Sequence, residues 1–261
     1  MKYNTIINGL PVTATYSKEF LLHTVTPLLH HCTDIYRQTG NRVIVFLAAP
    51  PAAGKSTMAE IFMRLSVSTP GVEPLAAVGM DGFHHYQDYL LTHETERDGQ
   101  MVNMVDIKGA PITFDLEALA ERIRRLKLEK EVPWPIYDRT THNPQDNAIV
   151  VKENIVLIEG NYLLLDEPGW RELSEMADVT ISITANPEIL RERLVQRKLQ
   201  TCPDRNKALH FVDFSDMANV TTCLEKSMPA DICFELKDNG DYICANNEIE
   251  GIGAKNDFST Q

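Results

Sequence analysis

Short apolar runs alternate with amphipathic segments along most of this 261-residue chain. The runs are rich in β-branched residues and nearly continuous in hydrophobicity. That pattern is typical of strands buried on both faces of a parallel sheet. The predicted strands are RVIVFLAA (42–49), LAAVGMD (75–81), NIVLIEG (154–160), DVTISITA (178–185) and ADICFEL (230–236), with DYICANN (241–247) as an extension.

Between these runs, apolar residues recur at helical spacing. In GKSTMAEIFMRLS (54–66) the residues Met58, Ile61, Phe62 and Leu65 share one face. Further helices are predicted over 114–130, with Asp115 as cap, over 186–200, with Asn186 as cap and Pro187 at the first position, and over 213–227. Alternating strands and helices predict an α/β fold with a mainly parallel sheet flanked by helices.

The first 41 residues precede this pattern and are predicted to form an appendage on the main domain. Alternation around Asn8-Gly9 indicates a small hairpin. A helix is then expected from Ser17, its cap, to Gly40, its end, with a bend at Pro27. We assign 42–250 to the main domain and 251–261 to a flexible tail.

Charge and cysteine content narrow the classes of function. The formal net charge of -12 argues against a general binder of nucleic acid or of anionic membranes. The five cysteines are widely spaced and form no C-x-x-C pair, which indicates reduced thiols in a cytoplasmic protein. The sequence contains no apolar stretch long enough to span a membrane, and its beginning lacks the apolar core of a signal peptide. Oligomeric state stays open, and a homodimer is compatible with the sequence.

AAPPAAGKST (48–57) lies between the first main-domain strand and a helix, as a phosphate-binding loop requires. Gly54, Lys55 and Ser56 fit the pattern G-x-x-x-x-G-K-[ST], whereas Ala49 occupies its first glycine position. The predicted donors to phosphate are the six N–H groups from Ala52 through Ala53, Gly54, Lys55 and Ser56 to Thr57. Lys55 would reach the terminal phosphates of ATP, and Ser56 would bind Mg²⁺. A working loop should keep Ala52 at negative φ and point Lys55 toward the strand ends. The alternative is a strand-to-helix turn with an incidental G-K-S.

Two acidic residues follow predicted strands at the edge where parallel sheets bind ligands. Asp81, in VGMDGFHH, could take a proton from an acceptor hydroxyl. Glu159, in IVLIEGNY, could bind Mg²⁺ through water or orient the base. A helix cap or a turn is the structural alternative for each carboxylate.

Four motifs, MDGFHH, KGAPITFD, YDRTTHNP and LIEGNYLLL, occur in this order with the loop. Together they resemble the P-loop kinases of the uridine kinase, phosphoribulokinase and bacterial pantothenate kinase group, and especially proteins labelled fructose-transport-system kinase or nucleoside/nucleotide kinase-like. The resemblance extends to about residue 236. Relatives usually read G-P-P-G-A-G-K-S-T in the loop, and here Ala49 and Ala52 replace two glycines. The nucleotide affinity is therefore in question, but the fold is not.

The resemblance implies a P-loop NTPase fold and phosphoryl transfer from ATP, with Mg²⁺, to an alcohol of a small molecule. Asp81 matches the general base, Lys55 and Ser56 the nucleotide and metal ligands, and Glu159 the acidic residue on the metal side. It also implies a mobile lid at about 188–215, whose arginines close on the phosphates. Arg193 and Arg197 share a helix face there, although a solvated face paired with Glu188 and Glu192 is the alternative.

Polar residues near the predicted base are candidates for binding the acceptor. They are His84, Lys108, Tyr137, Arg139 and His142. An ordinary Asp138–Arg139 loop ion pair is the alternative for the YDR segment, and Trp134 could be pocket wall or core. A zinc site at His84 and His85 is disfavoured, because no third ligand has suitable spacing.

Three functions remain in competition. The first is a kinase acting on a sugar or sugar-like compound, a nucleoside or a pantothenate-like compound. The second, prompted by the replaced glycines, is a nucleotide-binding regulatory switch with weak hydrolysis. The third is a structural homologue that has lost nucleotide binding. The polar segments near Asp81 favour the kinase, because a switch needs no pocket for an alcohol.

Overall fold

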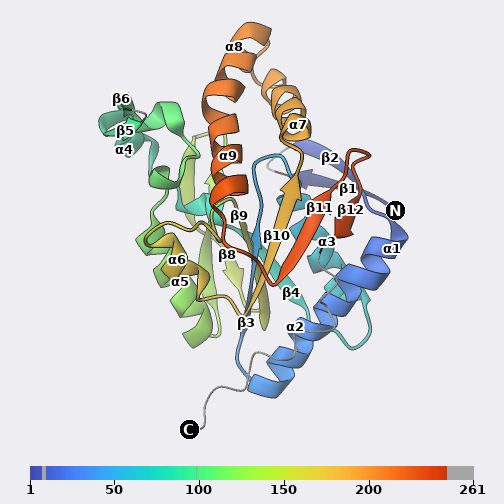
Figure 1. The fold of residues 1–261 in the computed structure, drawn as a ribbon. Helices are drawn as coiled ribbons and strands as arrows, with labels where there is room; N and C mark the ends of the chain where they lie inside the picture. The colour runs from blue at the N-terminus through green and yellow to red at the C-terminus, as the bar shows by residue number, and fades with distance from the viewer. Residues whose placement is uncertain (8–9, 98, 246–261) are drawn as a thin grey trace.

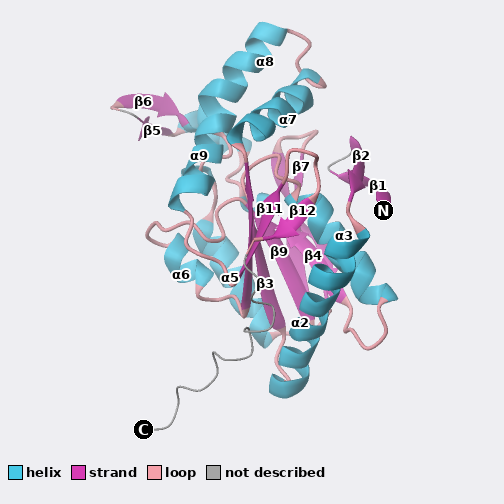
Figure 2. Ribbon diagram, turned by 45° about the vertical axis from the view of Figure 1, so that its right-hand side comes forward, coloured by secondary structure: helices cyan, strands magenta, loops and turns pink. Residues whose placement is uncertain are grey.

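A six-stranded sheet forms the centre of the molecule, with helices on both faces (Figures 1 and 2). The structure is a computed structural model that describes residues 1–7, 10–97 and 99–245. The strand order is β12-β11-β10-β3-β9-β4; the last five are parallel, and β12 pairs antiparallel with β11. The predicted fold class is confirmed. These strands are β3 (Val43–Ala48), β4 (Leu75–Gly79), β9 (Ile155–Gly160), β10 (Val179–Ala185), β11 (Ile232–Leu236) and β12 (Tyr242–Cys244).

Strand β3 is buried along its whole length, which explains its unbroken apolar sequence. Successive side chains of a strand point to opposite faces of the sheet. Val45 therefore packs in one core with α2 (Thr26–Thr39) and α3 (Lys55–Ser68). Phe46 packs in the other core with α5 (Leu116–Leu128) and α6 (Trp170–Ser174).

The N-terminal segment forms the predicted hairpin and helix, and the helix is part of the main core. The hairpin pairs β1 (Lys2–Ile7) with β2 (Leu10–Thr15), while its predicted Asn8-Gly9 turn lies outside the described residues, as does the tail. Helix α1 (Lys18–Phe20) begins at Ser17, whose hydroxyl accepts from the Phe20 N–H at 3.1 Å. It continues through a π-helical turn (Leu21–Val25) into α2, which starts beside Pro27 and ends at Gly40 with φ 68°. The wider turn accommodates the missing N–H of the proline.

Two antiparallel hairpins were not predicted. They pair β5 (Glu94–Arg97) with β6 (Gln100–Asn103), and β7 (Val132–Asp138) with β8 (Asn143–Val151). Strand β8 is mostly exposed and has no apolar alternation, so the usual strand signal is missing. Gly82 packs directly on β7, where any side chain would collide with the Pro135 carbonyl. Trp134 of β7 is fully buried and its indole N–H donates to the Gly79 carbonyl at 2.9 Å, so it is a core residue.

The predicted lid region is helical and extends beyond the sheet (Figure 1). It contains α7 (Pro187–Leu199), α8 (Arg205–Phe211) and a π-helical turn (Val212–Asp216), and α9 (Met217–Lys226) leads back to the core. Helix α4 (Gln87–Thr92) and the β5–β6 hairpin lie beside it in Figure 1. No helix in the described ranges has the length and apolarity needed to cross a membrane.

Candidate functional site

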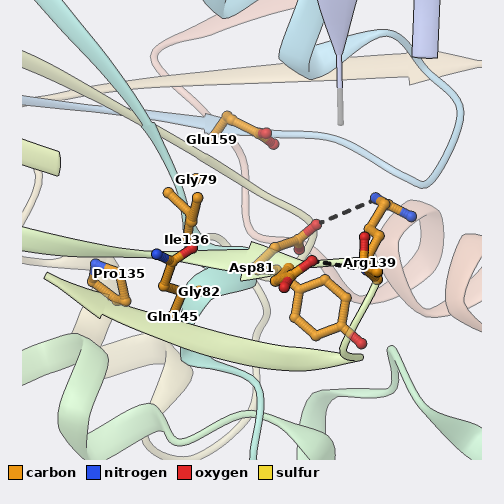
Figure 3. A pocket seen from close by; sticks show the side chains of 11 residues that line it. Gly79, Asp81, Gly82, Pro135, Ile136, Arg139, Gln145 and Glu159 are labelled. Carbon is orange, nitrogen blue, oxygen red and sulfur yellow. Dashed lines mark hydrogen bonds and ion pairs between the residues drawn. The ribbon is translucent and has the colours of Figure 1, made fainter. Parts of the chain in front are cut away.

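The strand register brings three chain segments to one point. Glu159 of β9 lies opposite Leu47 of β3 and Gly79 of β4. The loop after β3 and the short turn after β4 therefore flank Glu159 at the carboxyl edge of the sheet. A cavity of about 470 Å³ opens there, and Figure 3 shows its lining side chains. The lining residues are Gly79, Asp81, Gly82, Pro135, Ile136, Tyr137, Asp138, Arg139, Thr140, Gln145 and Glu159.

The entry of the predicted phosphate loop is a tight turn, and it corrects one expectation. Ala52 has φ 64°, so the predicted negative φ is wrong. The Ala53 N–H donates to the Pro50 carbonyl at 3.2 Å and closes a four-residue turn. Pro51 then occupies the position that proline favours in a type II turn, and Ala52 the next position, which requires positive φ. The proline thus explains the conformation, and the strain at Ala52 is of the order of 1 kcal/mol.

The remainder of the loop leads into helix α3. The Ala53 N–H is used inside the turn, so the count of six donors for phosphate is too high. Lys55, Ser56 and Thr57 form the first turn of α3, where backbone N–H groups lack intrahelical partners and can face an anion. Gly54, at φ 90°, marks the start of this helix. The strand, turn and helix therefore keep the architecture of an anion-binding loop.

Ser56 and Glu159 are in direct contact. The Ser56 hydroxyl donates to Oε1 of Glu159 at 2.7 Å. Burial raises the pKa of Glu159, the negative charge of Asp81 raises it further, and Lys55 opposes both. The hydroxyl and the carboxylate offer oxygen ligands of the kind that Mg²⁺ prefers. A site with only one or two protein ligands is usual for Mg²⁺ bound together with nucleotide phosphates, so these residues fit such an ion. Within the described residues no cluster of three or more His, Cys, Asp or Glu side chains could hold a metal alone.

The raised pKa of Glu159 predicts a pH-dependent stability effect. Its folded-state pKa lies above the unfolded value, so its stabilising contribution is present below pH ~4.3 and is lost as pH rises through the folded pKa. Glu159→Gln removes this titration while leaving an oxygen to accept from Ser56. We expect the variant's thermal unfolding midpoint to exceed that of the wild type by a few degrees at pH 8, with a smaller difference at pH 4.

Scanning calorimetry at the two pH values measures this effect. Glu121→Gln is the control, because Glu121 lies at the surface with a side chain 60% exposed and pairs only with Arg124 among the described residues. Equal differences at pH 4 and pH 8, or a loss of stability at pH 8, would contradict the expectation.

Asp81 lies in a short helical turn (Met80–Phe83) directly after β4 and points into the cavity (Figure 3). Burial favours its neutral form, but the positive field of His84, Lys55 and two arginines outweighs burial and lowers the pKa of Asp81. The carboxylate is therefore ionised at neutral pH. Lys55 lowers the pKa of both acids, and the orientation of its ammonium toward the strand ends stays a prediction.

His84 packs against the turn that carries Asp81 and is not among the cavity-lining residues. Its Nδ1 lies 2.9 Å from the Asp81 carbonyl oxygen, and because that oxygen only accepts, Nδ1 carries the proton. Burial lowers the pKa of His84, and the charge of Asp81 opposes that shift. The ring packs against Phe114 at a tilt of 41°, with 3.9 Å between centroids. His84 therefore braces the turn that carries Asp81, and its role toward an acceptor stays a prediction.

Lys108 links the turn between β7 and β8 to helix α4. Its ammonium donates to Oε1 of Gln87 at 2.7 Å and to the His142 carbonyl at 2.9 Å, and it lies over the Tyr137 ring. Tyr137 lines the cavity, and burial raises its pKa to about 12. His142, at φ 55°, contributes its carbonyl to this contact, while its side chain is exposed and is not among the cavity-lining residues.

Arg139 reaches across the cavity to the predicted base (Figure 3). Its Nη2 lies 4.0 Å from Oδ2 of Asp81. Asp138 instead accepts from the Thr140 N–H at 2.8 Å and the Thr141 hydroxyl at 2.9 Å. Arg139 therefore pairs with Asp81 rather than with its neighbour Asp138, which makes the turn. This arrangement leaves a guanidinium beside the carboxylate that faces the acceptor space.

The two lid arginines lie on the site side of α7. Arg193 donates from Nη1 to the Ala52 carbonyl at 3.3 Å, which links α7 to the phosphate loop. Arg197 contributes positive field at Asp81, and its own pKa is lowered by burial and by the charge of Arg139. In the described residues neither arginine makes an ion pair with Glu188 or Glu192, and the ion pair of this helix is Arg191–Asp213 at 2.7 Å. Both positions suit contact with phosphate, and their contact with ATP stays a prediction.

Two residues near the site carried no signal in the sequence. Gln145 lines the cavity from β8, a strand that was not predicted. Tyr242 of β12 donates its hydroxyl to the Ala53 carbonyl at 2.8 Å, from 189 residues further along the chain. The sequence predicted only a strand extension over 241–247, so this contact could be found only in three dimensions.

Comparison with known proteins places this site in a family. A family model described as "Phosphoribulokinase / Uridine kinase family" matches residues 44–228. The chain is 38% identical over 245 residues to the uncharacterized protein YggC of Escherichia coli, covering 93% of this chain and 98% of that protein. It is 30% identical over 193 residues to a Schizosaccharomyces pombe protein named "Putative uridine kinase", covering 72% and 80% of the two chains.

Solved structures agree with the family model. A "putative fructose transport system kinase" from Silicibacter sp. TM1040 superposes with a TM-score of 0.70 at 31% identity, over 79% of this chain and 98% of that one. Phosphoribulokinase from Rhodobacter spheroides superposes with a TM-score of 0.50 at 12% identity, over 74% and 70%, which supports the fold alone. With the family model covering most of the chain, this protein is a small-molecule kinase with a P-loop and belongs to the phosphoribulokinase and uridine kinase family.

Proposed function

We propose that this protein transfers the γ-phosphoryl group of ATP to a hydroxyl of a small, polar, hydroxylated metabolite. The observation that carries the proposal is the position of Asp81. An ionised carboxylate opens into the cavity at the strand end beside Glu159, which itself contacts Ser56 of the phosphate loop. A base and a phosphate-binding loop at one cavity are the two parts that an alcohol kinase needs.

The groups of the site have distinct roles in this transfer. Asp81 accepts the proton of the acceptor hydroxyl. The oxygen of that hydroxyl bonds to the γ-phosphorus, and the bond between the γ-phosphorus and the leaving ADP oxygen breaks. The N–H groups at the start of α3, together with Lys55, bind the phosphates. Arg193 and Arg197 neutralise charge on the transferring oxygens when α7 approaches. Catalysis of this kind depends mainly on positioning and on charge neutralisation.

Ser56 and Glu159 are the residues that would hold Mg²⁺. When bound, the ion supplies charge neutralisation on the phosphates of ATP. Both residues offer oxygen ligands, and they contact each other in this structure at 2.7 Å.

The acceptor side of the cavity favours a compound with several polar groups. Tyr137, Thr140 and Gln145 present hydroxyl and amide groups, and Arg139 presents a guanidinium next to Asp81. Such a set suits a sugar or sugar-like compound, a nucleoside or a pantothenate-like compound. Relatives carry names for different acceptors, among them uridine, pantothenate and fructose transport. The acceptor is therefore proposed only as a class.

A regulatory nucleotide switch is the competing function. This function was considered because Ala49 and Ala52 replace two loop glycines. The turn at Pro50–Ala53 nevertheless accommodates alanine and leaves the start of α3 intact. A switch uses water as the acceptor and does not need a polar cavity next to Asp81. We therefore favour the kinase.

ADP release from Mg-ATP distinguishes the two functions. We expect at least one member of a panel of sugars, sugar acids, nucleosides and pantothenate to raise the rate of ADP release tenfold or more over the rate without acceptor. Equal rates across the whole panel, at the slow rate of water hydrolysis, would favour the switch.

A further inference from the structure

Ala52 holds an unusual backbone conformation at the entry of the phosphate loop. Its φ of 64° is favourable for glycine and costly for alanine. Strained conformations persist where the surrounding structure holds them in place. The carbonyl groups of Ala52 and Ala53, the last two residues of the turn, accept hydrogen bonds that help to hold this conformation.

Two side chains from distant segments bind these consecutive carbonyls. Arg193 of α7 donates to the Ala52 carbonyl at 3.3 Å, and Tyr242 of β12 donates to the Ala53 carbonyl at 2.8 Å. Ala53 is fully buried, so its carbonyl would otherwise lose a partner on leaving water. The Tyr242 hydroxyl also fills the space beside Gly54, where any side-chain carbon would collide with it.

The Tyr242 ring is itself fixed by the N-terminal segment. It stacks on Tyr16, with 5.5 Å between ring centroids, and lies 5.9 Å from Phe20. Tyr242 and Tyr16 are 5% and 1% exposed, so neither ring can turn freely. The hydroxyl of Tyr242 therefore sits at a set position, determined by packing between β12 and the segment before α1.

We infer that Tyr242 is a positioning residue for the nucleotide site: its hydroxyl holds the phosphate loop in the conformation that Ala52 alone disfavours. Glycine at position 52 would adopt this conformation without strain. Pro51 favours this turn, and the hydroxyl bond to the Ala53 carbonyl helps to keep it closed before nucleotide arrives. Arg193 of α7 adds a second bond, to the Ala52 carbonyl, and its charge also acts on the Tyr242 hydroxyl.

The effect of Tyr242 should depend on residue 52. Tyr242→Phe keeps the stacked ring and removes only the hydroxyl bond. With Ala52 present, the turn should open toward ordinary dihedrals, and Mg-ADP binding should weaken about fivefold to tenfold. With Ala52→Gly, the turn should stay closed without the hydroxyl, and Tyr242→Phe should change Mg-ADP binding less than about twofold. This inference rests on the proposed nucleotide site.

The experiment is a double-mutant cycle read in two ways. Isothermal titration calorimetry with Mg-ADP measures nucleotide affinity in the wild type, the two single variants and the double variant. Amide hydrogen exchange at Ala53, whose N–H closes the turn, measures the loop without nucleotide. We expect faster exchange in Tyr242→Phe and recovery of protection in the double variant.

Tyr3→Phe is the matched control, because Tyr3 packs edge-on against Tyr16 in the same aromatic group and donates its hydroxyl only to Met1 among the described residues. It should change neither measurement. Unchanged Mg-ADP affinity in Tyr242→Phe, or an equal loss in the Ala52→Gly background, would overturn the inference. If the wild type fails to bind Mg-ADP, the proposed function fails, and the Ala53 exchange rates still decide the role of Tyr242.

Discussion

Replacing Asp81 with Asn should lower the rate of phosphoryl transfer by about 10²- to 10⁴-fold, the usual contribution of a general base. The asparagine amide keeps the size of the side chain but cannot accept the acceptor proton. The field of His84, Lys55 and the nearby arginines keeps the pKa of Asp81 low in spite of its partial desolvation, so the base is ready at neutral pH. Mg-ATP affinity should change little, because Asp81 faces the acceptor side of the cavity. Steady-state kcat with the best acceptor of the panel measures the effect.

The matched control for Asp81→Asn is Asp166→Asn. Asp166 is about half exposed and pairs with Arg171, away from the cavity lining. It should leave kcat unchanged, and both variants should show the circular dichroism of the folded wild type. A kcat for Asp81→Asn within threefold of the wild type would remove Asp81 from the mechanism.

Replacing Lys55 with Met should lower kcat/KM for ATP by about 10²- to 10³-fold, as expected for loss of one charged contact to the transferring phosphoryl group. The methionine keeps most of the side-chain length and its hydrophobic stem. A second effect follows from electrostatics. Lys55 contributes to the low pKa of Asp81, so its removal should raise that pKa. The acid limb of the pH–rate profile should therefore move to higher pH in Lys55→Met.

Lys226→Met controls for loss of a lysine elsewhere, because Lys226 is exposed and pairs with Glu167 at 3.0 Å. It should change neither kcat/KM nor the pH profile. An acid limb in Lys55→Met that stays in place, or moves to lower pH, would contradict the proposed arrangement of Lys55 next to Asp81.

The core of the fold was predictable because its signals are local. The apolar run of β3 reflects burial on both faces, and the Asp115 and Asn186 side chains accept from helix N–H groups as predicted caps. The sequence does not predict in the same way which strands are neighbours in the sheet. The sequence placed Asp81 and Glu159 each at a strand end, and only the order β3-β9-β4 brings them to the phosphate loop.

The sequence predictions that missed or contradicted the structure also have specific causes. The hairpin of β7 and β8 has too little apolar alternation, so it was interpreted as a turn-rich stretch, although its strands carry Tyr137 and Gln145 into the cavity. Ala52 was expected at negative φ because it was considered as a single replaced glycine. Its neighbour Pro51 favours a turn whose next residue has positive φ, as found at Ala52. The Tyr242 contact joins residues 189 positions apart in the sequence, and no local pattern marks it.

The most direct measurement is the detection of a phosphorylated acceptor. Phosphorus NMR of Mg-ATP with the acceptor that most stimulates ADP release should show one new phosphomonoester per ADP formed with the wild type. With Asp81→Asn the same ester should appear at least a hundredfold more slowly. Release of inorganic phosphate in place of the ester, at rates equal in the two proteins, would contradict phosphoryl transfer to a hydroxyl with Asp81 as the base.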